Sequence, residues 1–173
     1  MRTIKLFMTI LFSVFFLSKF NSQNIDKLKS NNGFRTIKLG SDVRNYKNLT
    51  LVSNKGEIKT YSLDLYKSPN FQKIGHIPIK ELELKSFQNK IYSIYITTSG
   101  DFSLIGMLTD TFGEASHKSD LGWFWRTDNI ELSVMGANEL LKNYYLHFAC
   151  TEIRSKAWNY EREKELQNNI SEF

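Results

Sequence analysis

The sequence predicts an α+β fold, in which a single domain contains a mainly antiparallel sheet of about six to eight strands. Several short segments alternate apolar and polar residues, which is the period of a strand. One segment, at about 101–112, changes to helical spacing, so we expect one well-defined helix packed on the sheet. A charged segment at about 154–173 has few apolar residues and predicts a helical tail.

The first residues are typical of a secretory signal peptide. Arg2 and Lys5 precede an apolar run, 6–17, and Lys19 ends the run well before the roughly 20 residues that a membrane-spanning helix needs. Ser22 is small enough to precede a cleavage site, although Phe20 is large for the usual small-x-small pattern.

We therefore expect residues 1–22 to be a signal peptide and 23–173 to form one α+β domain. The mature protein is then periplasmic or secreted, with no integral membrane span. An uncleaved N-terminal anchor is the alternative, because the predicted cleavage site is imperfect.

Removal of this segment changes the charge of the protein. The whole chain carries 23 basic and 18 acidic residues, and without Arg2, Lys5 and Lys19 it carries 20 against 18, a net charge of +2. So small a net charge argues against a specific nucleic-acid partner. Residues 23–99 carry 13 basic and 6 acidic side chains, and residues 100–173 carry 7 and 12. This difference can mark a partner surface, but the basic residues are scattered rather than grouped in runs, which favours two halves that complement each other in one fold.

The first part of the domain predicts short elements. Residues 34–39 alternate imperfectly as a short strand that Gly40 ends. Ser41 and Asp42 are residues that cap a helix, so a short helix is expected after them. The domain has no disulfide framework, because Cys150 is its single cysteine.

The middle of the chain predicts hairpins. Residues 48–66 form the first, because Asn54 and Gly56 tolerate the backbone of a tight turn. Residues 67–78 contain two prolines and predict a loop. The clearest pair of strands follows at 79–86 and 91–98, the second rich in β-branched and aromatic residues.

The last strands follow the expected helix. Residues 114–120 predict a loop, after which three segments alternate apolar and polar residues: 121–126, 129–135 and 143–153. In the helical tail, only three apolar residues are available as anchors: Trp158, Leu166 and Ile170.

The segment 122–126, "GWFWR", places Trp123 and Trp125 on one face of a strand and Phe124 on the other. Burial in the core is the favoured interpretation, because buried aromatic residues outnumber those that bind ligands. Arg126 keeps a ligand platform as the alternative, since a guanidinium beside indoles can stack or bind a carboxylate.

Motifs that carry chemistry are scarce. The three histidines are far apart in the sequence and show no metal-ligand spacing, so we expect no metal site and no cofactor. His147 and Cys150 are three residues apart on a strand, where their side chains face opposite ways. His117, in a polar segment beside Lys118 and Asp120, is the histidine singled out as a possible contact, although an ordinary solvated surface residue is the favoured interpretation.

These features favour a non-catalytic, exported binding or interaction module for a protein, peptide or glycan partner. Its tentative contact residues are Trp123, Trp125, Arg126 and His117. The alternative is a cell-envelope hydrolase whose polar groups meet only in the folded chain, with His117, Asp120 and Glu131 as its candidates.

Overall fold

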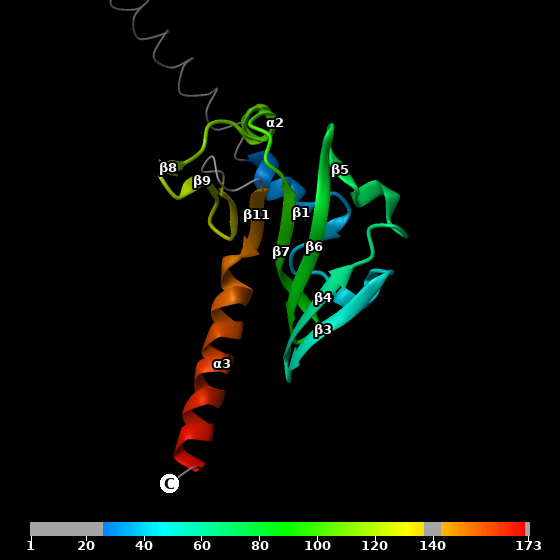
Figure 1. Ribbon diagram of the computed structural model, residues 1–173. Helices are drawn as coiled ribbons and strands as arrows, with labels where there is room; N and C mark the ends of the chain where they lie inside the picture. The colour runs from blue at the N-terminus through cyan, green and yellow to red at the C-terminus, as the bar shows by residue number, and fades with distance from the viewer. Residues whose placement is uncertain (1–25, 137–142, 172–173) are drawn as a thin grey trace, which may run out of the picture.

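Nine antiparallel strands form the main sheet of the protein in a computed structural model that describes residues 26–136 and 143–171. The fold is α+β, as the sequence predicts, and Figure 1 shows the sheet with α2 at one end and α3 alongside it. The predicted signal peptide at 1–22 lies outside the described residues.

The sheet order is β3-β4-β6-β7-β11-β10-β9-β8, and β5 pairs with the beginning of β6. The central strands β7 and β11 are therefore far apart in the sequence and adjacent in space. The bounds of the nine strands are β3 (Leu49–Lys55), β4 (Ile58–Leu63), β5 (Lys73–Ile74), β6 (Ile77–Phe87), β7 (Lys90–Ser99), β8 (His117–Ser119), β9 (Gly122–Arg126), β10 (Ile130–Met135) and β11 (Asn143–Cys150).

The predicted hairpins are confirmed, with turns between β3 and β4 and between β6 and β7. Gly56 has a φ of +79° in the first turn, the positive value that glycine accepts readily. The register also contains bulges that the sequence does not reveal. Val52 is the extra residue of edge strand β3, and Tyr92 is the extra residue of β7.

One face of the sheet packs into the hydrophobic core. The second layer consists of α2 (Ser103–Phe112) and the N-terminal part of the domain, which contains the helical residues 26–31 and a small hairpin of β1 (Gly33–Phe34) and β2 (Ile37–Lys38). Two short 3₁₀ helices, η1 (Val43–Asn45) and η2 (Pro69–Phe71), complete this part. The largest fully buried side chains include Trp125, Tyr144, Leu28, Ile37, Leu82, Leu84, Ile94, Ile96, Leu104 and Leu132.

Helix α2 confirms the helix predicted at about 101–112. Leu104, Leu108 and Phe112 are buried at a spacing of four, whereas Phe102 precedes the helix and is 74% exposed. Gly113 ends the helix with a φ of +82° and a ψ of −173°, a positive φ that glycine accepts readily.

Helix α3 (Thr151–Ser171) begins directly after β11, so the strand predicted to reach residue 153 ends at Cys150. The three apolar residues expected to anchor this helix are exposed, at 61%, 54% and 73%: Trp158, Leu166 and Ile170. The contact with the sheet comes instead from Ile153, Ala157 and Tyr160, which pack against Ile58, Tyr92 and Phe87. The face of α3 that meets the sheet is thus formed by residues at a spacing of three and four, 153, 157 and 160, and the three expected anchors are not part of it.

Three other expectations about short segments are wrong. Residues 34–39 form the β1–β2 hairpin, with Arg35 in its turn at a φ of +55°, and not a single strand. Pro78 lies within β6 and pairs with Lys73 of β5, at an end of the sheet where its missing N–H is tolerated. Part of the expected loop at 114–120 is edge strand β8.

Candidate functional site

The face of the sheet opposite the core carries polar and aromatic side chains in three cross-strand rows. Helix α3 packs on this same side over the end near Ile58 and Phe87, and its first turn also reaches Glu131 of β10 through Arg154. We name the remainder the open face. Its rows, read from β6 towards β8, are Glu81, Thr97, Tyr145 and Met135; Glu83, Tyr95, His147, Ser133, Phe124 and His117; and Lys85, Ser93, Ala149, Glu131 and Arg126.

A stacked pair of rings occupies the middle of the open face. Tyr95 of β7 and His147 of β11 are direct cross-strand partners, with ring centroids 4.2 Å apart and planes 4° from parallel. The ammonium of Lys85 lies 5.1 Å from the centroid of the Tyr95 ring. The tyrosine ring therefore has a ring neighbour and a cation beside it and cannot offer a free flat surface.

His147 is held by a hydrogen bond to a buried serine. Its Nε2 lies 3.1 Å from Ser93 Oγ, and Ser93 is fully buried. Burial lowers the pKa of His147 to about 4, with Arg154 and Lys85 adding to the effect and Glu131 opposing it. The imidazole is consequently neutral at pH 7. In this hydrogen bond either its Nε2–H donates to Ser93 Oγ or the serine hydroxyl donates to Nε2, depending on the tautomer.

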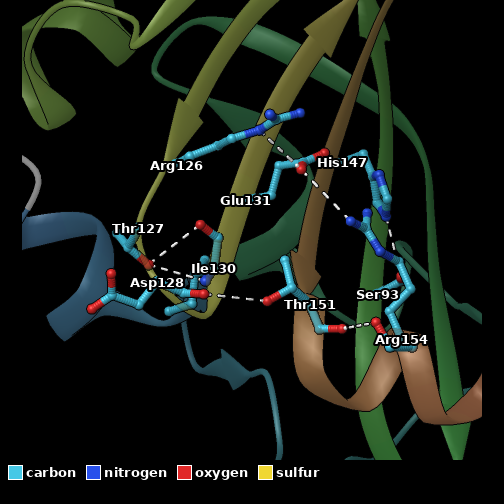
Figure 2. Close-up of polar contacts among 10 residues, drawn as sticks. Ser93, Arg126, Thr127, Asp128, Ile130, Glu131, His147, Thr151 and Arg154 are labelled. Atoms are coloured by element: carbon cyan, nitrogen blue, oxygen red, sulfur yellow. Dashed lines mark hydrogen bonds and ion pairs between the residues drawn. The ribbon is translucent and has the colours of Figure 1, made fainter.

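Glu131 is the anionic centre of the site. Its carboxylate lies 3.2 Å from Arg126 Nε and 3.6 Å from Arg154 Nη2, and Figure 2 shows the carboxylate between the two guanidinium groups. The Glu131 side chain is only 14% exposed, so these ion pairs are better shielded than typical surface pairs. The carboxylate holds β9, β10 and α3 together.

The turn between β9 and β10 fixes the start of α3 and thereby positions Arg154. Ile130 N donates to Thr127 Oγ1 at 3.0 Å within the turn. Thr151 N, at the first residue of α3, donates to the Asn129 carbonyl at 2.9 Å. Figure 2 shows the Thr127–Ile130 contact, and a further contact from Thr151 Oγ1 to the Asp128 carbonyl at 3.5 Å, below the Glu131 ion pairs.

Beside this fixed centre lies an exposed hydrophobic pair. Tyr145 and Met135 are direct cross-strand partners and are 41% and 42% exposed. Phe124 lies one row away, where its ring contacts the His117 ring at 5.8 Å and the Arg126 guanidinium at 5.9 Å. Aromatic, methionine and arginine side chains are therefore grouped on one exposed face.

The structure separates the four residues that the sequence suggested for binding. Trp125 is fully buried and donates from Nε1 to the Gly113 carbonyl at 2.8 Å, so it joins β9 to the end of α2. Trp123 is half-buried against the same core. Only Arg126 and His117 lie on the open face.

Tyr95, His147, Tyr145 and Met135 were not identified by the sequence reasoning. The alternation in 143–150 does assign Tyr145 and His147 to the face opposite the core. Their neighbours could not be identified, because β7 and β11 are separated by about fifty residues and pair only in the folded chain.

The arrangement offers little for the hydrolase alternative. The buried hydroxyl of Ser93 is closed to a substrate, although its hydrogen bond to His147 has the length expected of a nucleophile and its base. His117 is aligned across β9 with Ser133 and not with Glu131, and Asp120 lies in the β8–β9 turn.

In 26–136 and 143–171, no group of three or more His, Cys, Asp or Glu side chains is placed to hold a metal ion. Within the same ranges, no helix has the length and apolar character needed to cross a membrane.

Comparison of the chain with protein-family models, with curated proteins and with solved structures finds no match.

Proposed function

We propose that this protein is an exported, non-catalytic interaction module and that its open face binds a protein partner. The observation that carries the proposal is the exposed pair Tyr145 and Met135 beside Phe124 and Arg126. Tyrosine, phenylalanine, methionine and arginine are enriched in protein interfaces, and tyrosine and arginine dominate their binding energy.

The fixed centre of the open face favours this function. Tyr95, His147 and Ser93 hold one another, and Glu131 is held by two arginines. Side chains that are already ordered lose less entropy when a partner binds. The surface is thus preorganised next to its exposed hydrophobic pair.

A protein partner is favoured over a glycan. Aromatic platforms for sugars present a free ring face, whereas the Tyr95 ring has His147 and Lys85 beside it. The face also has acidic residues in its first two rows, Glu81 and Glu83, and basic residues on the side near α3, Lys85, Arg126 and Arg154. Such a charge pattern can select the orientation of a protein surface.

Site-specific photocrosslinking in the exporting cell tests the proposal. A photoreactive phenylalanine analogue is placed at Tyr145 or, as the control, at Tyr66, a residue of the same type that is 95% exposed outside the open face. We expect a discrete protein adduct from position 145 and none from position 66.

The adduct at 145 should disappear when Met135→Ser is added and persist when Tyr66→Ser is added. Equal adducts from both positions would refute the proposal, as would an adduct that survives Met135→Ser. If the adduct is lost after the cells are treated with glycosidases, but is kept when unlabelled protein is added as a competitor, a glycan would be favoured instead.

A further inference from the structure

A cavity of about 250 Å³ lies on the core side of the sheet, opposite the open face. It is formed by the β1–β2 hairpin, α2, β5 and β11. No residue that lines the cavity is acidic. Most of the lining is apolar and consists of Phe34, Ile74, Leu108, Phe112, Leu146 and Phe148; the other lining residues are Asn31, Gly33, Arg35 and Thr111.

Core side chains line this cavity directly. Leu108, Phe112, Leu146 and Phe148 are buried residues of the hydrophobic core, with exposures of 7%, 6%, 1% and 2%. A ligand that enters the cavity therefore meets the interior of the domain, where each apolar contact replaces contact with water.

Arg35 is the only charged residue of the lining. Its Nη2 donates to the Lys73 carbonyl at 2.6 Å, and its guanidinium lies 5.5 Å from the Phe34 ring centroid. A guanidinium has five N–H donors, so this hydrogen bond leaves most of them unused. Among the ion pairs of the described residues, none includes Arg35.

The backbone at Arg35 is also unusual. Its φ is +55°, a conformation that glycine and asparagine adopt readily and that arginine adopts rarely. Residues held in such conformations cluster at active sites and ligand clamps. Here the conformation places a cation at the rim of an apolar cavity.

We propose that this cavity binds a small apolar carboxylate. The apolar body of the ligand enters between α2 and β11, and its carboxylate pairs with the Arg35 guanidinium, the geometry that arginine forms best. An engineered cavity of about 150 Å³ binds benzene, so a site of this size suits one ring with a short chain. This proposal is independent of the function of the open face.

Three matched probes test the charge requirement by isothermal titration calorimetry: 3-phenylpropanoate, 3-phenylpropan-1-ol and 3-phenylpropylamine. We expect the acid to bind with a Kd on the order of 0.1 mM. The alcohol should bind at least about tenfold more weakly and the amine not at all, because only the acid can pair with a guanidinium.

Arg35→Gly is the decisive variant, because glycine accepts the positive φ and the hairpin keeps its fold. In this variant the acid should lose its preference and bind no better than the alcohol. Thr111→Trp, at the exposed rim, should block both ligands. Gly106→Trp is its control on the same helix, where an added Cβ meets nothing within 4 Å, and it should change neither affinity.

Equal binding of the acid and the alcohol by the parent protein would overturn the proposal. So would retention of the acid preference in Arg35→Gly, and so would saturable binding of none of the three probes. Unfolding temperatures of each variant, measured beforehand, confirm that a lost affinity is not a lost fold.

Discussion

Three adjacent aromatic side chains on β9 have three different environments. Trp125 is fully buried and hydrogen-bonded, Trp123 is half-buried on the same side, and Phe124 is on the open face with His117 and Arg126. The alternation of a strand predicts that Phe124 faces away from the two tryptophans. It does not predict that the second face lacks a covering layer, which is a property of the whole sheet.

Alanine substitution should separate these environments. Trp125→Ala removes a buried indole and should lower the free energy of unfolding by about 3–5 kcal/mol. Phe124→Ala should cost less, about 1 kcal/mol, because its ring is partly exposed. Urea unfolding of both variants measures the difference. Equal costs would mean that Phe124 is as deeply packed as Trp125.

His147 should make stability depend on pH. Its pKa is about 4 in the folded protein against 6.5 for a free histidine, because burial disfavours the imidazolium. Between these values the unfolded chain binds a proton that the folded chain does not. The free energy of unfolding should therefore fall by about 2–3 kcal/mol as the pH decreases from 6.5 to 4.

Urea unfolding at pH 7 and pH 4.5 measures this effect, with His147→Gln as the comparison. Glutamine can still bond Ser93 but does not titrate, so the variant should lose much less stability over this interval. The idea fails if the parent and the variant have the same dependence on pH. Exposed carboxylates with lowered pKa values, such as those of Asp64 and Glu152, also stabilise the folded protein, but this contribution is lost only at lower pH. These carboxylates are present in both the parent and the variant.

At the level of elements, α3 shows that the most hydrophobic residues of a helix are not always the ones that face the core. Its largest apolar residue, Trp158, is 61% exposed and lies 5.6 Å from the Arg162 guanidinium. Ala157, by contrast, is 2% exposed and lies against Ile58 and Tyr92. The ion pair between Lys55 and Glu161, at 2.7 Å, adds a contact with the β3–β4 hairpin.

Substitutions on the two faces of α3 should therefore differ in their effect on the stability of the protein. Ala157→Leu adds volume at a closed contact and should destabilise the protein by about 1–3 kcal/mol. Leu166→Ala removes most of an apolar side chain, yet it should change the free energy of unfolding by less than about 0.5 kcal/mol, because that side chain is exposed. Thermal unfolding distinguishes them. A larger loss for Leu166→Ala would show that α3 packs through its apolar residues.

Much of the element pattern could be predicted from the sequence, because alternation and turn residues act locally. The hairpins around Gly56 and at 88–89, and the helix that Gly113 ends, are of this kind. The short strands β5 and β8 could not be predicted, since a strand of two or three residues exists only beside its partner. The Tyr95 and His147 pair depends on a long-range register in the same way.

At the scale of the whole molecule, the sheet divides the protein into two unlike sides. The core side contains the second layer and the cavity beside Arg35. The other side contains the open face, next to the contact with α3. A protein partner on the open face and a small acid in the cavity could therefore be bound together without contact between them.

The predicted signal peptide at 1–22 gives a separate prediction about the whole chain. Because a basic start precedes a short apolar run at 6–17, the mature protein should begin within a few residues of Ser22 and need no detergent. Mass spectrometry and N-terminal sequencing of material from outside the cytoplasm check this. An intact Met1 in that material would show that the segment is kept as an anchor.

The bulge at Val52 has a consequence for aggregation at the edge of the sheet. Edge strand β3 exposes Leu51 and Val52, at 49% and 56%, and a straight edge of this kind would be a template on which further chains could polymerise. The extra residue interrupts the regular spacing of hydrogen-bonding groups along that edge, so an incoming strand cannot continue the ladder past it. Concentrated solutions of the protein should therefore stay free of fibrils, and deletion of Val52 should produce amyloid-dye fluorescence where the parent gives none.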